Sequence, residues 1–152
     1  MTDQEFEDYW AFLVEKKHSA MAALSSDERV FYAANIFRGS VPRSGLIGYF
    51  ENTGCDVIRD AHHALATLDL PEALKLLQNA QRIVLNGDPL PDTDQCLVLF
   101  DDDLPEADLV KAMDDLDQRV GDIQSLLYLQ DRPVFDALCR LADEKSLGVS
   151  KG

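Results

Sequence analysis

Apolar side chains recur at intervals of three and four residues along most of the chain, which is the spacing of one face of an α-helix. The first such face begins near the N-terminus, where Thr2 and Glu5 have the spacing of a capping box that would start the helix. This periodicity predicts an all-α protein. The predicted buried face of the first helix consists of Phe6, Tyr9, Trp10, Leu13, Val14, Met21 and Leu24.

Start and stop signals divide the rest of the N-terminal half into further helices. Ser25 and Glu28 repeat the capping-box spacing, and the segment 27–38 is apolar on nearly all sides, which predicts a helix at the centre of the bundle. We expect Gly39 to end this helix and a short helix to follow Pro42 as far as about Asn52. The other helices predicted in this half are 55–68 and 71–84.

The C-terminal half begins with a long loop over 86–94, which is rich in turn-forming residues. The apolar run 96–100 could be a buried strand, but Asp92 and Gln95 have capping-box spacing and no partner strand is evident, so we expect a short helix. A last helix is predicted from Pro133. Between the segment 96–100 and this last helix, a long helix is predicted from Pro105. It would bury a heptad-like seam of Leu109, Met113, Leu116, Val120, Ile123 and Leu127.

The length of 152 residues fits a single helical domain, 1–152, of about six to eight helices. A domain of this size buries about 68–70% of its unfolded surface and needs no disulfide. The three cysteines are far apart and odd in number, which predicts reduced thiols in the cytoplasm. We find no membrane-spanning apolar run and no basic-then-apolar leader. The expected aromatic core is Trp10, Phe31, Phe37, Tyr49, Phe50 and Phe135.

The net charge of −14 argues against direct binding to nucleic acid or to an anionic membrane, since both depend on basic side chains. The charge is also uneven. The segment 86–122 holds 12 acidic residues and only two basic ones, Lys111 and Arg119, for a net charge of −10. Most of the excess negative charge therefore lies in about a quarter of the chain.

The segment SGLIGYFENTG, residues 44–54, places Gly45 and Gly48 in a predicted helix, although each glycine costs about 1 kcal/mol relative to alanine. We expect the glycines to allow close approach of a neighbouring helix, and Asn52 with Gly54 to cap the C-terminal end. A phosphate-binding loop is disfavoured because no strand precedes the segment and no lysine follows it. We therefore interpret it as a packing and turn motif.

The same segment resembles the signature of a bacterial family of all-helical domains typified by a DNA-mimic protein. Ser44 stands where that signature has its first glycine, and Pro42 with Arg43 replaces the usual asparagine. The resemblance extends over about 31–84. It implies an all-helical fold, a DNA-binding protein as partner and, by analogy, a homodimer. The matching positions are Gly45, Leu46, Tyr49, Phe50, Asn52 and Gly54.

The acidic residues of the predicted helix after Pro105 fall on more than one line. Asp108, Asp115 and Asp122 are seven residues apart, roughly 10.5 Å along a helix axis. Phosphates of one DNA strand rise about 3.4 Å each, so one such line cannot reproduce a phosphate backbone. Mimicry would need carboxylates from other lines and from the preceding turn. The candidate partner-binding surface is Asp101, Asp102, Asp103, Glu106, Asp108, Asp114, Asp115 and Asp117.

Two interpretations of this surface remain open from the sequence. It can be a solvated face that keeps the protein in solution, as most runs of charge are. It can instead bind a basic protein, and the family resemblance implies a DNA-binding transcription regulator that is sequestered by a DNA mimic. The second interpretation needs no enzymatic activity and no cofactor, only carboxylates that meet Arg and Lys.

Two other functions compete with it. A metal-dependent enzyme could use the region of His62 and His63, although adjacent helical residues point about 100° apart and cannot both face one metal. Asp56, Asp60 and His63 share a helical face, which a solvated surface also explains. The third candidate is an immunity or antitoxin-like protein that binds a basic toxin through the same acidic surface.

Overall fold

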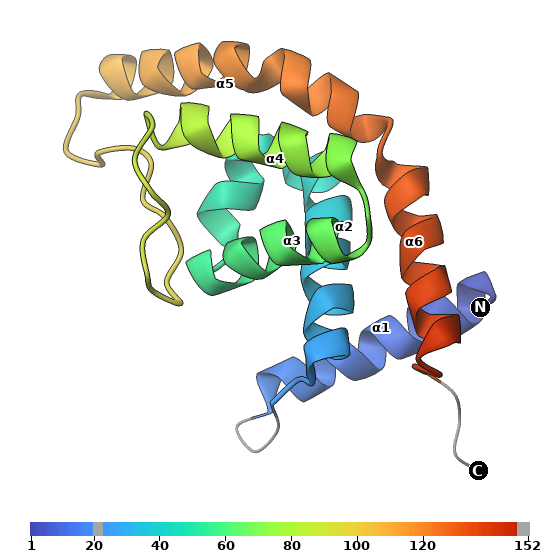
Figure 1. Cartoon of the computed structure of the whole chain (residues 1–152). Coiled ribbons are helices and arrows are strands. Elements are labelled where there is room, and N and C mark those ends of the chain that lie inside the picture. The colour runs from blue at the N-terminus through green and yellow to red at the C-terminus, as the bar shows by residue number, and fades with distance from the viewer. Residues whose placement is uncertain (20–22, 149–152) are drawn as a thin grey trace.

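The computed structural model describes residues 1–19 and 23–148, and within these ranges the secondary structure is six α-helices without a β-strand. This confirms the all-α prediction and the expected helix number. Figure 1 shows their arrangement around a central helix. The helices are α1 (Asp3–His18), α2 (Ser26–Asn52), α3 (Cys55–Thr67), α4 (Pro71–Val84), α5 (Glu106–Tyr128) and α6 (Asp131–Glu144).

Both predicted capping boxes start their helices. The Thr2 hydroxyl accepts a hydrogen bond from the Glu5 backbone N–H at 3.1 Å, and the Glu5 carboxylate accepts one from the Thr2 N–H at 2.7 Å. Ser25 and Glu28 do the same for α2. The first helix is shorter than expected, because α1 ends at His18 and leaves Leu24 beyond it. Met21 lies outside the described residues.

Helix α2 corrects the prediction that Gly39 ends it. The helix continues through Gly39 and Pro42 and is interrupted only at Gly45, where φ is +73° and ψ is 174°. Gly39 needs no special backbone conformation here, and the loss of one N–H at Pro42 is tolerated because buried Val41 keeps this turn packed in the core. The two predicted helices are therefore one element with a break three residues after the proline.

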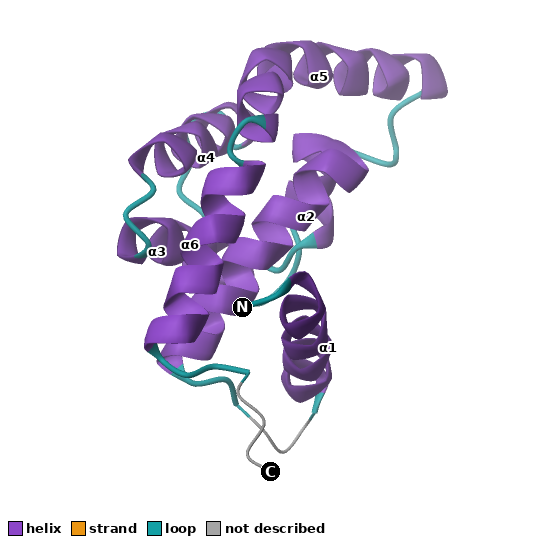
Figure 2. Ribbon diagram, turned by 90° about the vertical axis from the view of Figure 1, so that its right-hand side faces the viewer, coloured by secondary structure: helices purple, strands orange, loops and turns teal. Residues whose placement is uncertain are grey.

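As predicted, α2 forms the centre of the molecule. It contacts α1, α3, α5 and α6, and Figures 1 and 2 show these helices on its different sides. Phe31 packs on Phe6 with ring centroids 5.2 Å apart, and Phe37 packs on Tyr49 at the same distance. These rings form a continuous buried core along α2.

Two of the predicted core aromatic residues lie at the border of this core. Trp10 is half-buried and stacks on Tyr32 with centroids 5.3 Å apart. Phe135 is also half-buried; it packs on Phe6 at 4.6 Å, and the Arg38 guanidinium lies over its ring. The Arg38 cation over Phe135 stabilises that ring without complete burial.

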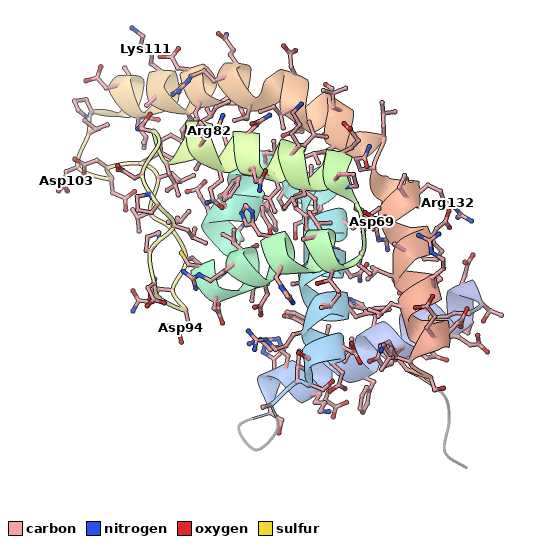
Figure 3. All side chains as sticks on the ribbon, viewed as in Figure 1. Asp69, Arg82, Asp94, Asp103, Lys111 and Arg132 are labelled. Carbon is pink, nitrogen blue, oxygen red and sulfur yellow. The ribbon has the colours of Figure 1, made fainter. Side chains whose placement is uncertain are left out.

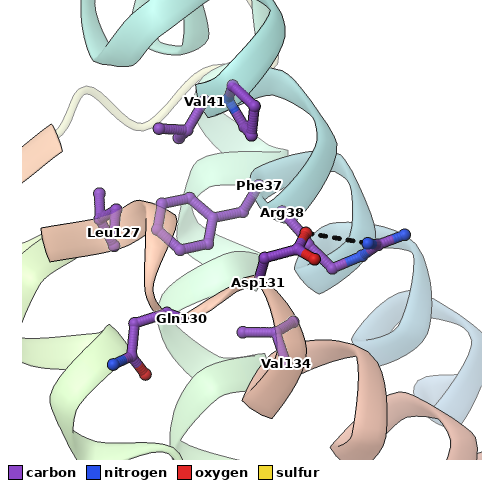
Figure 4. A pocket seen from close by; sticks show the side chains of 8 residues that line it. Phe37, Arg38, Val41, Leu127, Gln130, Asp131 and Val134 are labelled. Atoms are coloured by element: carbon purple, nitrogen blue, oxygen red, sulfur yellow. Dashed lines mark hydrogen bonds and ion pairs between the residues drawn. The ribbon is translucent and has the colours of Figure 1, made fainter. Parts of the chain in front are cut away.

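Helix α4 contacts α3 and α5, whereas α5 and α6 both contact the central helix α2. Pro71 opens α4 at its first turn, as expected, and α4 runs beside α5 in Figure 1. At the turn between α5 and α6, a cavity of about 10 Å³ separates Phe37 and Val41 from Leu127 and Val134. Figure 4 shows this cavity beside the ion pair of Arg38 with Asp131. Its size admits about one water molecule, so it is not a ligand site.

The segment 96–100 is not the short helix that we predicted. Cys96 forms an isolated antiparallel bridge with Gly54, and the Cys55 N–H donates to the Gln95 carbonyl at 3.0 Å. Val98 is 86% exposed, whereas its neighbours on both sides pack against the core. This alternation has the period of an extended chain, which explains why the capping-box spacing before it starts no helix.

Gly54 also has a different role from the predicted C-terminal cap of α2. Thr53 caps α2 with an extended backbone, and Gly54 is the residue before the first turn of α3. A Cβ atom at Gly54 would lie 2.6 Å from the Asp94 carbonyl oxygen. Glycine is required there because the long loop passes directly over the backbone.

None of the described helices is long and apolar enough to cross a membrane.

Candidate partner-binding surface

The acidic loop end and α5 carry the eight predicted surface carboxylates, and all eight residues are exposed. The first three lie in the turn before α5, where the Asp101 carboxylate accepts a hydrogen bond from the Asp103 N–H at 2.9 Å. Figure 3 shows Asp103 at the outer edge of this turn. Glu106 and Asp108 follow in the first turn of α5, where negative charge is favoured by the helix dipole.

These carboxylates lack cationic partners. Within residues 1–19 and 23–148, no Lys, Arg or His side chain lies within the 4.0 Å ion-pair distance of any of the eight. In the segment 86–122 the ion pair that forms is Asp92 with Arg59, at 3.9 Å. Lys111 on α5 points outward (Figure 3). The negative field of this surface is therefore not neutralised locally.

Helix α5 holds this surface on the outside of the molecule through a narrow buried side. Leu116, Val120 and Leu127 are buried, as the predicted seam requires. The other three members of the predicted seam are less buried: Leu109 and Ile123 are half-buried, and Met113 is 42% exposed. Figure 2 shows the N-terminal end of α5 extending to the side beyond α2, and 106–115 contains no buried residue. Carboxylates on several lines of this half consequently face solvent.

A single glutamine of α5 connects this helix to the motif 44–54. The Gln124 Oε1 accepts a hydrogen bond from the Leu46 backbone N–H at 2.8 Å, and its Nε2 donates to the Tyr128 hydroxyl at 2.9 Å. The Leu46 N–H is free to donate because the left-handed backbone of Gly45 interrupts the helix. A Cβ at Gly45 would lie 3.0 Å from the same Oε1. Sequence analysis did not identify Gln124 as a contact residue. The sequence feature that could have indicated it is a polar residue next to the apolar seam.

The two glycines of the motif thus act differently from each other. Gly45 allows the close approach of α5, as predicted, although through a break in the helix. A Cβ at Gly48 would instead meet the Cβ of Ser44, at 2.6 Å, which belongs to the same element. The three large apolar residues predicted to share one face, Leu46, Tyr49 and Phe50, are completely buried. Asn52 is exposed at the end of α2.

A family model described as DMP19-like protein matches residues 22–140, which include the central helix, the motif, the long loop and the acidic helix. The chain belongs to the DMP19-like family. No curated protein and no solved structure matches this DMP19-like chain. The resemblance inferred from the motif is confirmed, and the match extends beyond the motif to the whole of α5.

In this DMP19-like chain the two adjacent histidines have separate local partners. His62 is half-buried, and its Nε2 lies 2.6 Å from the Gln81 Oε1. Burial lowers the pKa of His62 more than this hydrogen bond raises it, so the ring is held neutral more strongly than a free imidazole. His63 is exposed, and its Nε2 lies 3.4 Å from the Thr67 hydroxyl.

One carboxylate near His63, that of Asp60, is also paired. The Arg29 guanidinium donates to both oxygens of Asp60, at 2.7 Å and 3.1 Å. A hollow of about 250 Å³ beside this ion pair is lined by Arg29, Val30, Asp60 and His63. Among the described residues, no three His, Cys, Asp or Glu side chains are grouped so that they could hold a metal ion. The region around His63 therefore consists of an Arg29–Asp60 ion pair beside a surface hollow.

Proposed function

We propose that this protein is a non-enzymatic DNA mimic that binds a basic DNA-binding regulator through the acidic surface of α5 and the turn before it. The observation that carries the proposal is the concentration of exposed carboxylates without cationic partners on one helix and its leading turn. Membership of the DMP19-like family supports it, since the family that the motif 44–54 resembles is typified by a DNA-mimic protein. We place this activity in the cytoplasm.

The number and extent of the charges suit this role. A protein that binds DNA commonly neutralises about 6–10 phosphates. The proposed surface offers eight carboxylates. Those on α5 lie between Glu106 and Asp117, about 17 Å of helix at 1.5 Å per residue, which is about half a turn of DNA, and the turn at 101–103 continues the surface. A single line of aspartates spaced roughly 10.5 Å apart is too sparse. The adjacent lines and the turn at 101–103 together supply the necessary density.

The chemistry of binding would be the same as at a phosphate backbone. Arg and Lys donate charge-assisted hydrogen bonds to carboxylates as they do to phosphates. Because the surface has few local cations, a basic partner gains attraction without having to displace an existing ion pair. We expect association to be fast at low salt and to weaken steeply as the salt concentration rises.

The test is affinity capture from the source cells with the immobilised full chain, washed at about 50 mM and at about 500 mM salt. The variant Asp108→Asn, Asp114→Asn, Asp115→Asn, Asp117→Asn removes four charges from the surface. The matched control removes four exposed charges elsewhere: Glu7→Gln, Glu15→Gln, Glu72→Gln and Glu144→Gln. We expect one DNA-binding protein to be retained at low salt by the wild type and the control, and lost by the Asn variant.

Equal capture by all three chains, or no capture, would contradict the proposal and leave the carboxylates as a solvated face. Capture of a basic toxin in place of a DNA-binding protein would favour an immunity or antitoxin-like function of the same surface. A homodimer is a separate expectation from the family resemblance, and sedimentation of the purified chain tests it.

A further inference from the structure

Two apolar side chains lie exposed among the carboxylates of the acidic helix. Val110 is 50% exposed and Met113 is 42% exposed, although both belong to a 23-residue helix with a buried side. A contiguous apolar patch with a polar rim is the surface pattern of an interaction site, whereas single exposed apolar residues are not. Val110 and Met113 both lie in the N-terminal half of α5, where 106–115 contains no buried residue.

The residues around this pair are acidic. Glu106 precedes Val110 by four residues and Asp114 follows it by four, while Asp117 follows Met113 by four. On a helix such residues are neighbours on the surface, about 5–6 Å apart between Cβ atoms. Val110 and Met113, three residues apart, are neighbours as well. The α5 acidic–apolar face, which we define as these five residues, is therefore an apolar centre with carboxylates around it.

The form of this face suits another helix. The row Glu106, Val110, Asp114 and the row Met113, Asp117 are parallel ridges of residues four apart, and the groove between two such ridges accepts a ridge of a packed helix. Gly121 continues the second row, and a Cβ there would meet no atom within 4 Å, so the groove stays open at this end. The flexible Met113 side chain can adapt to a partner.

Resting on the proposed function, we propose that the α5 acidic–apolar face binds an amphipathic basic helix of the partner. An apolar side chain of that helix covers Val110 and Met113, and Lys or Arg side chains flanking it meet Glu106, Asp114 and Asp117. Charge complementarity selects this occupant. A second copy of the chain would set the same carboxylates against each other at a few ångströms, which is destabilising.

The test uses two synthetic 18-residue Lys-rich peptides of equal charge and helical periodicity, one with a Leu stripe and one with Ser at the same positions. Binding to the full chain is measured by calorimetry over a range of salt concentrations. The variant Val110→Thr, Met113→Gln keeps the shape and charge of the face and removes its apolar character. We expect the Leu peptide to bind at least about tenfold more tightly than the Ser peptide to the wild type, and the two to bind equally to the variant.

The outcomes separate this proposal from the proposed function. Equal, salt-dependent binding of both peptides to the wild type would overturn the apolar contact and leave the acidic surface as a binder of basic partners. Retention of the Leu preference by the Thr/Gln variant, or binding of neither peptide, would also overturn the proposal. If the wild type self-associates and the Val110→Thr, Met113→Gln variant is a monomer, the face binds a second copy of the chain instead.

Discussion

At the scale of single residues, the contact between Gln124 and the backbone after Gly45 links the family motif to the acidic helix. The sequence indicated that a glycine in the motif 44–54 would allow close packing. It could not show which glycine adopts a positive φ, because that depends on where α5 lies. The partner residue is 78 positions away in the chain, and nothing in local spacing identifies it.

We predict that Gln124→Ala destabilises the protein by about 1–3 kcal/mol, because the Leu46 N–H would lose its acceptor in a partly buried position. The measurement is urea unfolding at neutral pH. Gln118→Ala, at an exposed position of the same helix, is the control and should change the free energy of unfolding by less than about 0.5 kcal/mol. Equal effects of both substitutions would show that the hydrogen bond does not hold α5.

A second residue-scale prediction concerns Glu28, which is 7% exposed and accepts hydrogen bonds from Lys16 at 2.8 Å and 3.0 Å. Burial raises the pKa of Glu28, but hydrogen bonds from Lys16 and Ser25 lower it more, and the net shift is downward. Its stabilising effect is therefore complete above the unfolded-state pKa of about 4.3 and is lost as the pH falls through the lower folded-state value.

We expect Glu28→Gln to be less stable than the wild type at pH 7, and the difference to shrink as the pH falls below about 4.3. Urea unfolding at a series of pH values measures it. Glu7→Gln, which changes an exposed carboxylate of α1, should differ from the wild type by less than about 0.5 kcal/mol at neutral pH. A difference for Glu28→Gln that stays constant down to acid pH would contradict this account.

At the scale of elements, three predicted helix starts were confirmed, whereas one predicted end and one predicted start were wrong. The confirmed starts depend on local sequence signals that act within one turn. These signals are the capping boxes at Thr2 and Ser25 and the proline at position 71. The end expected at Gly39 and the helix expected at 96–100 were wrong, because tertiary packing decides both. Val41 keeps α2 helical, and half-buried residues on both sides of Val98 hold 96–100 extended.

Helix α5 should be unevenly stable along its length. Its buried residues begin at Leu116, and 106–115 contains none. Local opening costs less where few apolar contacts must be broken. We predict that amide hydrogens of 106–115 exchange at least about tenfold faster than those of 116–127, as measured by hydrogen–deuterium exchange. Uniform protection along α5 would mean that another contact holds its N-terminal half.

At the scale of the whole molecule, composition already located the acidic segment, and the structure determines which of its charges share a surface. The net charge of −10 on residues 86–122 follows from the sequence alone. The sequence did not show that cations of other helices leave the α5 carboxylates unpaired. Arg29, Arg38 and Lys16 could have paired with these carboxylates and instead pair with Asp60, Asp131 and Glu28. Long-range ion pairs depend on the fold.

A net charge of −14 also predicts that salt stabilises this protein, because like charges repel in the compact state. Raising NaCl from about 10 mM to about 200 mM should raise the Tm, since the screening length falls from about 30 Å to below 10 Å. The variant with Asn at positions 108, 114, 115 and 117 should show a smaller rise. A Tm that falls with salt would mean that the ion pairs outweigh the repulsion.

The most direct test of the central claim is a competition between this chain and DNA for the captured regulator. Labelled operator DNA bound to the regulator is titrated with the chain, and fluorescence anisotropy measures the fraction of DNA still bound. We predict stoichiometric displacement by the wild type and by the four-Gln control, and none by the four-Asn variant. Formation of a ternary complex in which the DNA stays bound would contradict the claim that the acidic surface occupies the DNA site.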